Sequence, residues 1–164
     1  MWKQKNRPKT TARSYALWLL GRKPYAVLAL RQRLEKRGYS VDEASDAVNY
    51  LAEIGYLNDQ VYAADFVSTR AQAGNGPRKL SWELKSRGIS AEAAGQALGN
   101  LDLTQLRAQA LIVAKRRLGR VYQGDPKARV SLLRYLLQRG YEYDLAKEVV
   151  AELLACLDSD GQNS

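Results

Sequence analysis

Hydrophobic positions recur at helical spacing over most of the chain and form one pattern that occurs three times. Each copy has two Leu four residues apart, an Arg-Gly pair followed by an apolar residue, and then an Ala and two aliphatic residues. The copies are Leu30, Leu34, Arg37, Gly38, Tyr39, Ala44, Val48 and Leu51; Leu80, Leu84, Arg87, Gly88, Ile89, Ala94, Leu98 and Leu101; and Leu132, Leu136, Arg139, Gly140, Tyr141, Ala146, Val150 and Leu153. A period of about 50 residues is typical of stacked helical units. The pattern therefore predicts an all-α protein, an elongated array of three tandem three-helix repeats.

Capping signals mark where the helices of each repeat begin and end. Ser40 and Glu43 have the spacing of a capping box, which predicts a helix start after Ser40. The Gly of each Arg-Gly pair matches the left-handed residue that ends many helices. Asn58 is expected to cap a helix over 59–73, and a further helix is expected over 103–118.

Prolines are expected to lie in the first turn of the middle helix of each repeat, where the missing N–H is not needed. They are Pro24, Pro77 and Pro126, and Asp125 is a natural N-cap before the last of them. The stretch 73–77 is rich in Gly and predicts the most flexible internal joint.

These signals give the following division of the chain. We expect a basic flexible arm over 1–11, three-helix repeats over 12–57, 58–102 and 103–157, and a flexible tail over 158–164. The ends are assigned as flexible because they lack hydrophobic periodicity.

The composition argues against an enzyme. The chain has no His and one Cys, Cys156, so a zinc site or a Cys-His or Ser-His pair has too few ligands or partners. No Gly-rich phosphate loop is present, and the carboxylates at 42, 43 and 46 fall in a first helical turn, where the helix dipole favours them. We expect no cofactor and no metal. Without a long apolar run or a secretory signal, we expect a cytoplasmic protein that does not contact a membrane.

The net charge of +9 is concentrated in blocks, which favours a polyanionic partner. Residues 1–34 contain nine basic residues and no acidic one, and residues 107–139 contain nine basic residues and one Asp. Residues 35–66 and 140–160 contain seven and six carboxylates, which could contact a basic protein. A simpler alternative is that these charges only solvate exposed helix faces.

Several aromatic side chains are expected in the helix cores, because Tyr and Trp bury large areas. This applies to Tyr15, Trp18, Tyr62, Phe66 and Trp82. Only Trp2 and Tyr122 are placed beside basic residues in the way that base stacking requires.

The segments 55–70 and 76–89 resemble the RecX family of bacterial recombination regulators. The matching residues are Leu57, Asp59, Ala63, Phe66, Arg70, Gly76, Glu83, Leu84 and Gly88. The resemblance extends over residues 12–157. The chain departs from the family pattern at Asn58, at Ala26 and Ala29, and at Glu142.

The resemblance implies a regulatory protein that binds RecA and its filament on single-stranded DNA. It further implies that this protein lies in the filament groove and inhibits the recombinase, ATPase and co-protease activities of RecA, without a catalytic site of its own. We expect a monomer with weak, non-specific binding to single-stranded DNA. The alternative is a stand-alone basic helical DNA-binding protein, such as a helix-turn-helix regulator.

Basic residues of the second and third repeats are the predicted RecA and DNA contacts. They are Arg70, Arg78, Lys79, Arg87, Lys115, Arg116, Arg117, Arg120 and Arg129. For Arg87, as for Arg37 and Arg139, the alternative is a cation that complements the C-terminus of its own helix.

Overall fold

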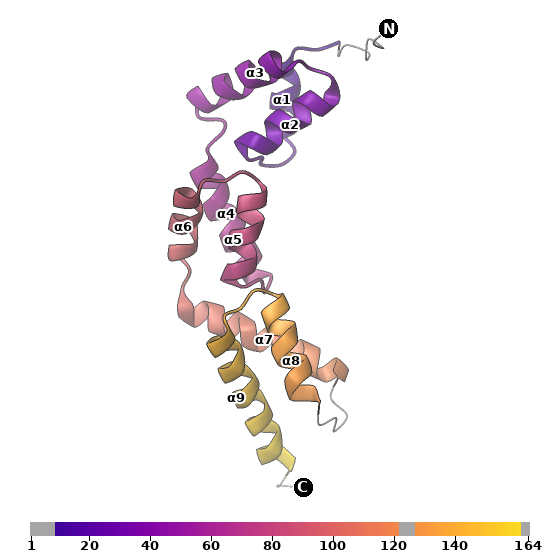
Figure 1. Cartoon of the computed structure of the whole chain (residues 1–164), viewed down its shortest axis with the longest axis vertical. Helices are drawn as coiled ribbons and strands as arrows, with labels where there is room; N and C mark the ends of the chain where they lie inside the picture. The colour runs from indigo at the N-terminus through magenta and orange to yellow at the C-terminus, as the bar shows by residue number, and fades with distance from the viewer. Residues whose placement is uncertain (1–8, 122–126, 162–164) are drawn as a thin grey trace. The chain divides into compact units, whose positions relative to one another are not determined.

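The computed structural model describes residues 9–121 and 127–161, and these residues form nine helices and no strand (Figure 1). The helices are α1 (Ala12–Leu20), α2 (Val27–Arg37), α3 (Val41–Glu53), α4 (Asp59–Gln72), α5 (Pro77–Ser86), α6 (Ala91–Gly99), α7 (Leu103–Val121), α8 (Ala128–Gln138) and α9 (Tyr143–Gly161). The prediction of an all-α helical repeat fold is confirmed for this part of the chain.

The chain forms two compact units. Unit 1 comprises residues 1–64 and 84–94, and unit 2 comprises residues 65–83 and 95–164. The helices α4, α5 and α6 therefore each contribute residues to both units.

The core of unit 1 lies among α1, α2 and α3, where α2 and α1 both pack against α3. Leu30, Leu34 and Leu51, three of the repeated positions, are fully buried there. Ala16 from α1 and Val48 from α3 complete the contact between the helices. The leucines of the repeat pattern thus form the contacts between the helices of unit 1. Burying one Leu side chain stabilises a fold by about 1.5–3 kcal/mol.

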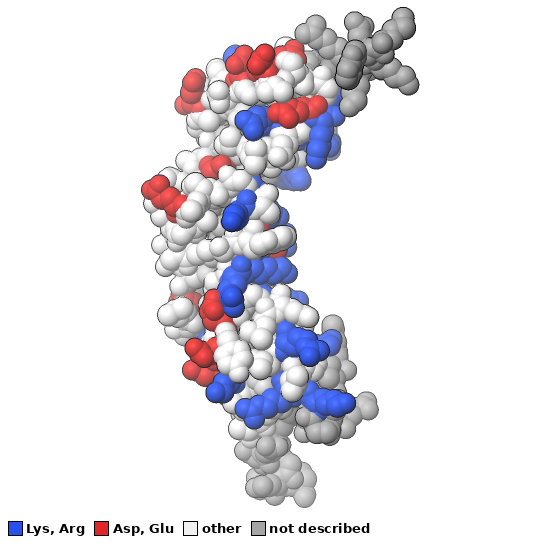
Figure 2. All heavy atoms as spheres, viewed as in Figure 1, with Lys and Arg blue, Asp and Glu red and all other residues white. Residues whose placement is uncertain are grey.

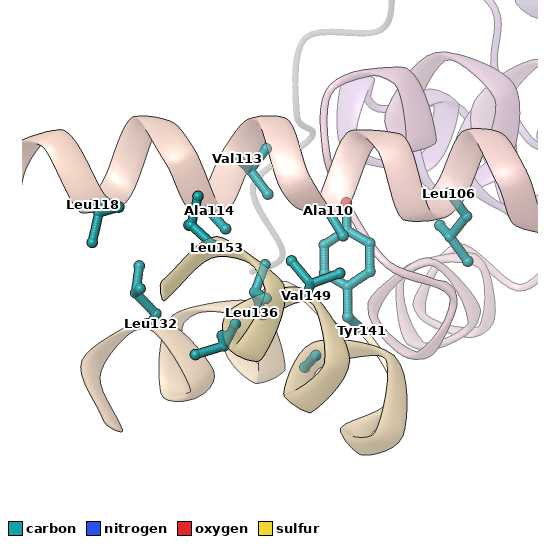
Figure 3. Close-up of a cluster of buried hydrophobic side chains, with 12 residues drawn as sticks. Leu106, Ala110, Val113, Ala114, Leu118, Leu132, Leu136, Tyr141, Val149 and Leu153 are labelled. Carbon is teal, nitrogen blue, oxygen red and sulfur yellow. The ribbon is translucent and has the colours of Figure 1, made fainter. Parts of the chain in front are cut away.

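The core of unit 2 lies among α7, α8 and α9 and uses the corresponding positions (Figure 3). Leu132 and Leu136 of α8 are fully buried between α7 and α9. Tyr141, which follows the Gly of the third copy, has its ring in this core and its hydroxyl directed toward α7 beside Ala110 (Figure 3).

The predicted caps are present where the structure describes them. The Ser40 hydroxyl accepts a hydrogen bond from the Glu43 N–H (3.1 Å), and the Glu43 carboxylate accepts one from the Ser40 N–H (2.8 Å). The Asn58 side chain accepts from the N–H groups at the start of α4, at 2.9 and 3.2 Å. The helix stops are also confirmed: Gly38, Gly88 and Gly140 all have positive φ, a conformation that costs Gly little.

The start of α2 differs from the prediction. Pro77 opens α5 as expected, but α2 begins at Val27, three residues after Pro24. Its first N–H group, that of Val27, is capped by the Asp59 carboxylate of α4 at 2.9 Å. The cap therefore comes from a residue distant in sequence. Asp125 and Pro126 lie outside the described residues.

The stretch 73–76 is a packed turn rather than an open joint. Gly74, Asn75 and Gly76 are buried, and the Asn75 side-chain amide donates to the Arg70 carbonyl at 3.0 Å. The Gly76 N–H donates to the Arg139 carbonyl at 2.7 Å. A Cβ on Gly76 would lie 2.3 Å from the carbonyl carbon of Gly140, so only Gly fits at this position.

Candidate functional site

A groove between α7 and α8 in unit 2 collects basic side chains. It consists of two adjoining hollows of about 590 and 200 Å³, which share Arg117 and Tyr135 in their linings. We call it the α7–α8 groove, and its charged and aromatic lining residues are Arg116, Arg117, Lys127, Arg134, Tyr135 and Arg139. Figure 2 shows Lys and Arg side chains gathered over α8. No carboxylate lines either hollow.

Tyr135 positions two of the guanidinium groups. The Cζ atom of Arg117 lies 5.5 Å from the centre of the Tyr135 ring, and that of Arg139 lies 5.2 Å from it. Both distances are in the range of cation–π attraction. The half-buried ring thereby holds a cation from α7 and a cation from the end of α8 in the same groove.

Arg139 is also fixed by the end of α4. Its side chain donates hydrogen bonds to the carbonyls of Ala73 and Gly74, both at 3.2 Å. These are carbonyls at the C-terminal end of α4, where a helix lacks internal donors and its dipole favours a cation. Arg139 is the C-cap residue of α8, and its side chain also complements the end of α4.

Three other Arg residues supply positive charge to the groove. Arg116 and Arg134 are exposed, and neither they nor Arg117 forms an ion pair in the part of the chain that the structure describes. The Nε atom of Arg117 is buried and has no hydrogen-bond acceptor among the described residues. A buried donor without an acceptor costs about 1–3 kcal/mol, more when it is charged.

The predicted contact residues are distributed over several places. Arg116 and Arg117 line the groove, whereas Lys115 and Arg129 are exposed outside its lining. Arg78 forms an exposed ion pair with Glu142, with 3.8 Å between Arg78 Nε and Glu142 Oε1.

Three of the remaining predicted residues, Arg70, Lys79 and Arg87, are not part of the groove lining. Arg70 is exposed on α4 and stacks near Phe66, with its Cζ 5.4 Å from the ring centre. Lys79 and Arg87 are half-buried. The side chain of Arg120 lies outside the part that the structure describes.

The sequence analysis did not select Lys127, Arg134, Tyr135 or Arg139 as site residues. Spacing identifies Lys127, Arg134 and Tyr135, because 127, 131, 134, 135 and 138 follow the i, i+4, i+7, i+8 and i+11 pattern of one helix face. Arg139, at i+12, lies off this face. On this face of α8, Lys127 and Arg134 lie in the same groove as the basic side chains of α7.

A second cluster of cations and aromatic rings lies on unit 1. Trp18 is 51% exposed, stacks on Tyr15 with 5.6 Å between ring centres, and has the Arg22 guanidinium 4.1 Å above its ring. Arg37 lies in the last turn of α2 with its Cζ 5.5 Å from the Tyr15 ring. The prediction that Trp18 is a core residue is therefore wrong. It is also wrong for Trp82, which is 69% exposed.

The described residues offer neither a metal site nor a membrane-spanning helix. They contain no group of three or more His, Cys, Asp or Glu side chains arranged to hold a metal ion. None of the helices described is both long enough and apolar enough to span a membrane.

Comparison with known proteins assigns the chain to a family. The model of the first three-helix domain of RecX matches residues 12–51, and that of the second three-helix domain of RecX matches residues 58–98. A regulatory protein RecX from Haemophilus ducreyi is 31% identical over 134 residues, which cover 82% of this chain and 87% of that protein. The chain belongs to the RecX family.

Other RecX proteins support the assignment and the fold. A regulatory protein RecX from Clostridium botulinum is 30% identical over 128 residues, which cover 76% of this chain and 60% of that protein, so the chain spans only part of its length. The crystal structure of RecX from Lactobacillus salivarius has a TM-score of 0.75 at 22% identity and covers 87% of this chain and 94% of that one. The resemblance drawn from residues 55–70 and 76–89 is thereby confirmed.

Proposed function

We propose that this RecX-family protein binds RecA and the RecA filament on single-stranded DNA, and that it inhibits the recombinase, ATPase and co-protease activities of RecA. The observation that carries the proposal is membership in the RecX family. The protein acts by binding rather than by catalysis, as a monomer in the cytoplasm.

The charge of the α7–α8 groove supports a nucleoprotein partner. A filament on DNA is a polyanion, and phosphates attract Lys and Arg over a range set by the ionic strength. Arg116, Arg117 and Arg134 supply positive charge that no carboxylate of the described residues neutralises through an ion pair. A protein that occupies part of a filament in this way hinders strand exchange without a reaction of its own.

The decisive experiment measures ATP hydrolysis by RecA on single-stranded DNA while this protein is added. We expect the rate to fall as the protein approaches an equimolar ratio to RecA. An unchanged rate at that ratio contradicts the proposal.

A charge-reversal variant connects the inhibition to the groove. Arg116→Glu with Arg117→Glu is expected to weaken inhibition while the helical circular dichroism stays the same. The matched control is Arg33→Glu with Lys147→Glu, which changes the net charge equally at exposed positions outside the groove. If the control weakens inhibition as much as the groove variant, the effect comes from total charge.

The alternative, a stand-alone basic DNA-binding protein, is favoured by the same groove. Fluorescence anisotropy with a labelled oligonucleotide over a salt series separates the two functions. Tight binding with a steep negative salt slope and no effect on RecA hydrolysis supports the alternative. Weak binding together with slowed hydrolysis supports the RecA modulator.

A further inference from the structure

The cations of the α7–α8 groove are spread along the length of α8 and do not converge on a single position. Lys127, Arg134 and Arg139 follow α8 from its N-cap to its C-cap, a rise of about 18 Å at 1.5 Å per residue. Arg116 and Arg117 of α7 lie on the other side of the same groove. Such a row fits a linear chain of anionic groups better than one small anion.

The partial burial of the Arg117 side chain indicates a groove rather than a basic face that is fully solvated. Its side chain is half-buried beside Tyr135, and the Nε atom is shielded from solvent without an acceptor. Solvated surface guanidinium groups keep their donors in water. The rest of the guanidinium lines both hollows of the groove, where an anion can contact it.

Arg139 and Tyr135 hold part of the groove lining in place before a ligand binds. Because Arg139 is held by two carbonyls of the α4 end and by the Tyr135 ring, it is fixed before any ligand arrives. Fixed donors lose little conformational entropy on binding. Tyr135 also offers the aromatic edge of the groove to a sugar or a base.

We infer that the α7–α8 groove binds the sugar–phosphate backbone of a single nucleic-acid strand. The Arg117 guanidinium contacts one phosphate, and Arg116 and Arg134 contact neighbouring phosphates. Hollows of about 590 and 200 Å³ have room for parts of one strand but not for a base-paired duplex. The inference rests on the proposed function for the identity of the strand, the DNA inside the RecA filament.

The test is direct binding without RecA, measured by fluorescence anisotropy of a labelled oligo-dT over a salt series. Arg116→Gln with Arg134→Gln removes two exposed cations, so folding is preserved. We expect at least tenfold weaker binding and a salt slope shallower by about 1.4, from 0.7 per lost phosphate contact on a single strand. The control Arg33→Gln with Lys147→Gln has the same net charge and is expected to bind within threefold of the unaltered protein.

Arg117→Lys tests the planar guanidinium of Arg117 separately from its charge. Lys keeps the positive charge but has no Nε donor and no planar fork. We expect severalfold weaker binding with a thermal midpoint close to that of the unaltered protein. Unaltered binding by this variant, or equal losses in the groove variant and the control, overturns the inference.

Two competitors identify the class of ligand. An unlabelled hairpin duplex and a poly-glutamate peptide of similar charge are added to the oligo-dT complex. We expect oligo-dT itself to compete at least tenfold better than either, and equal competition by the duplex or the peptide overturns the assignment to a single strand. RecA hydrolysis is measured in parallel with the same variants. If hydrolysis is unaffected by this protein while oligo-dT still binds in the groove, the proposed function fails and the groove assignment stands.

Discussion

The Tyr141 side chain is fully buried in the core of unit 2, and its hydroxyl has no hydrogen-bond partner in the described part of the structure. Replacing Tyr141 by Phe keeps the ring packing and removes this hydroxyl. A buried hydroxyl without a partner costs about 1–3 kcal/mol. We therefore expect Tyr141→Phe to stabilise the protein by about 1 kcal/mol, which raises the midpoint by about 4–8 °C for a unit of 60–100 residues.

Thermal unfolding followed by circular dichroism at pH 7 measures this effect. Tyr143→Phe is the matched control, because Tyr143 is exposed and its hydroxyl is solvated, so its midpoint is expected to stay unchanged. If Tyr141→Phe lowers the midpoint by several degrees, the hydroxyl has a stabilising partner and the reasoning from its burial is refuted.

The same burial predicts a pH dependence. Burial raises the pKa of Tyr141 to about 12 from its usual 10.0, although the nearby Arg139 cation lowers it. Between pH 10 and pH 12 the unfolded chain releases this proton while the folded chain keeps it, so stability falls as the pH rises. Two pKa units correspond to a loss on the order of 2–3 kcal/mol.

Denaturation by urea at a series of pH values isolates this contribution. The stability of Tyr141→Phe minus that of the unaltered protein is expected to grow from pH 9 to pH 12, because the variant lacks the titrating group. A difference that stays constant over this range means that the Tyr141 hydroxyl ionises as easily in the folded protein as in the unfolded chain.

Three further substitutions test contacts of the fold by urea denaturation. Asp59→Ala removes the carboxylate that caps α2 at Val27 and is expected to cost about 1 kcal/mol; Asp59→Asn keeps an acceptor and should recover most of the loss, and equal losses would argue against a capping role. Gly76→Ala places a Cβ against the backbone of Gly140 and is expected to cost about 1–3 kcal/mol; a neutral result would show that the turn can shift. Gly95→Ala adds a Cβ in open space within α6 and is expected to stabilise by about 0.5–1 kcal/mol; a loss would mean that this Cβ meets a neighbour.

Much of the fold could be predicted from local signals in the sequence. Leu30 and Leu34 share one helix face, so their spacing alone predicts a buried stripe. The Ser40 capping box and the stop at Gly38 depend on residues within one or two turns. Trp18 was misassigned because periodicity identifies the side of a helix but not whether a neighbouring helix covers it. The cap of α2 escaped prediction because its acceptor, Asp59, lies on another helix.

The candidate site could be predicted only in part for the same reason. The basic block over 107–139 directed attention to Arg116 and Arg117, which do line the groove. Arg134 belongs to the same block, yet its place in the site depends on how α8 packs against α7. The role of Arg139 depends on the end of α4, which is 65 residues away in sequence from its partner at Gly74. Contacts between residues so far apart in the sequence produce no local sequence pattern that could predict them.

The turn at Arg139 and Gly140 has a consequence for how the protein is made. It supplies carbonyl acceptors to the N–H groups of Gly76 and Arg78, and the Arg139 side chain supplies donors to the end of α4. Synthesis proceeds at about 5–20 residues per second, so the turn after α4 waits roughly 3–13 seconds for a partner 65 residues later. During that interval the backbone groups of the turn after α4 have no partner. Unit 2 therefore completes its folding only after Arg139 and Gly140 have been synthesised.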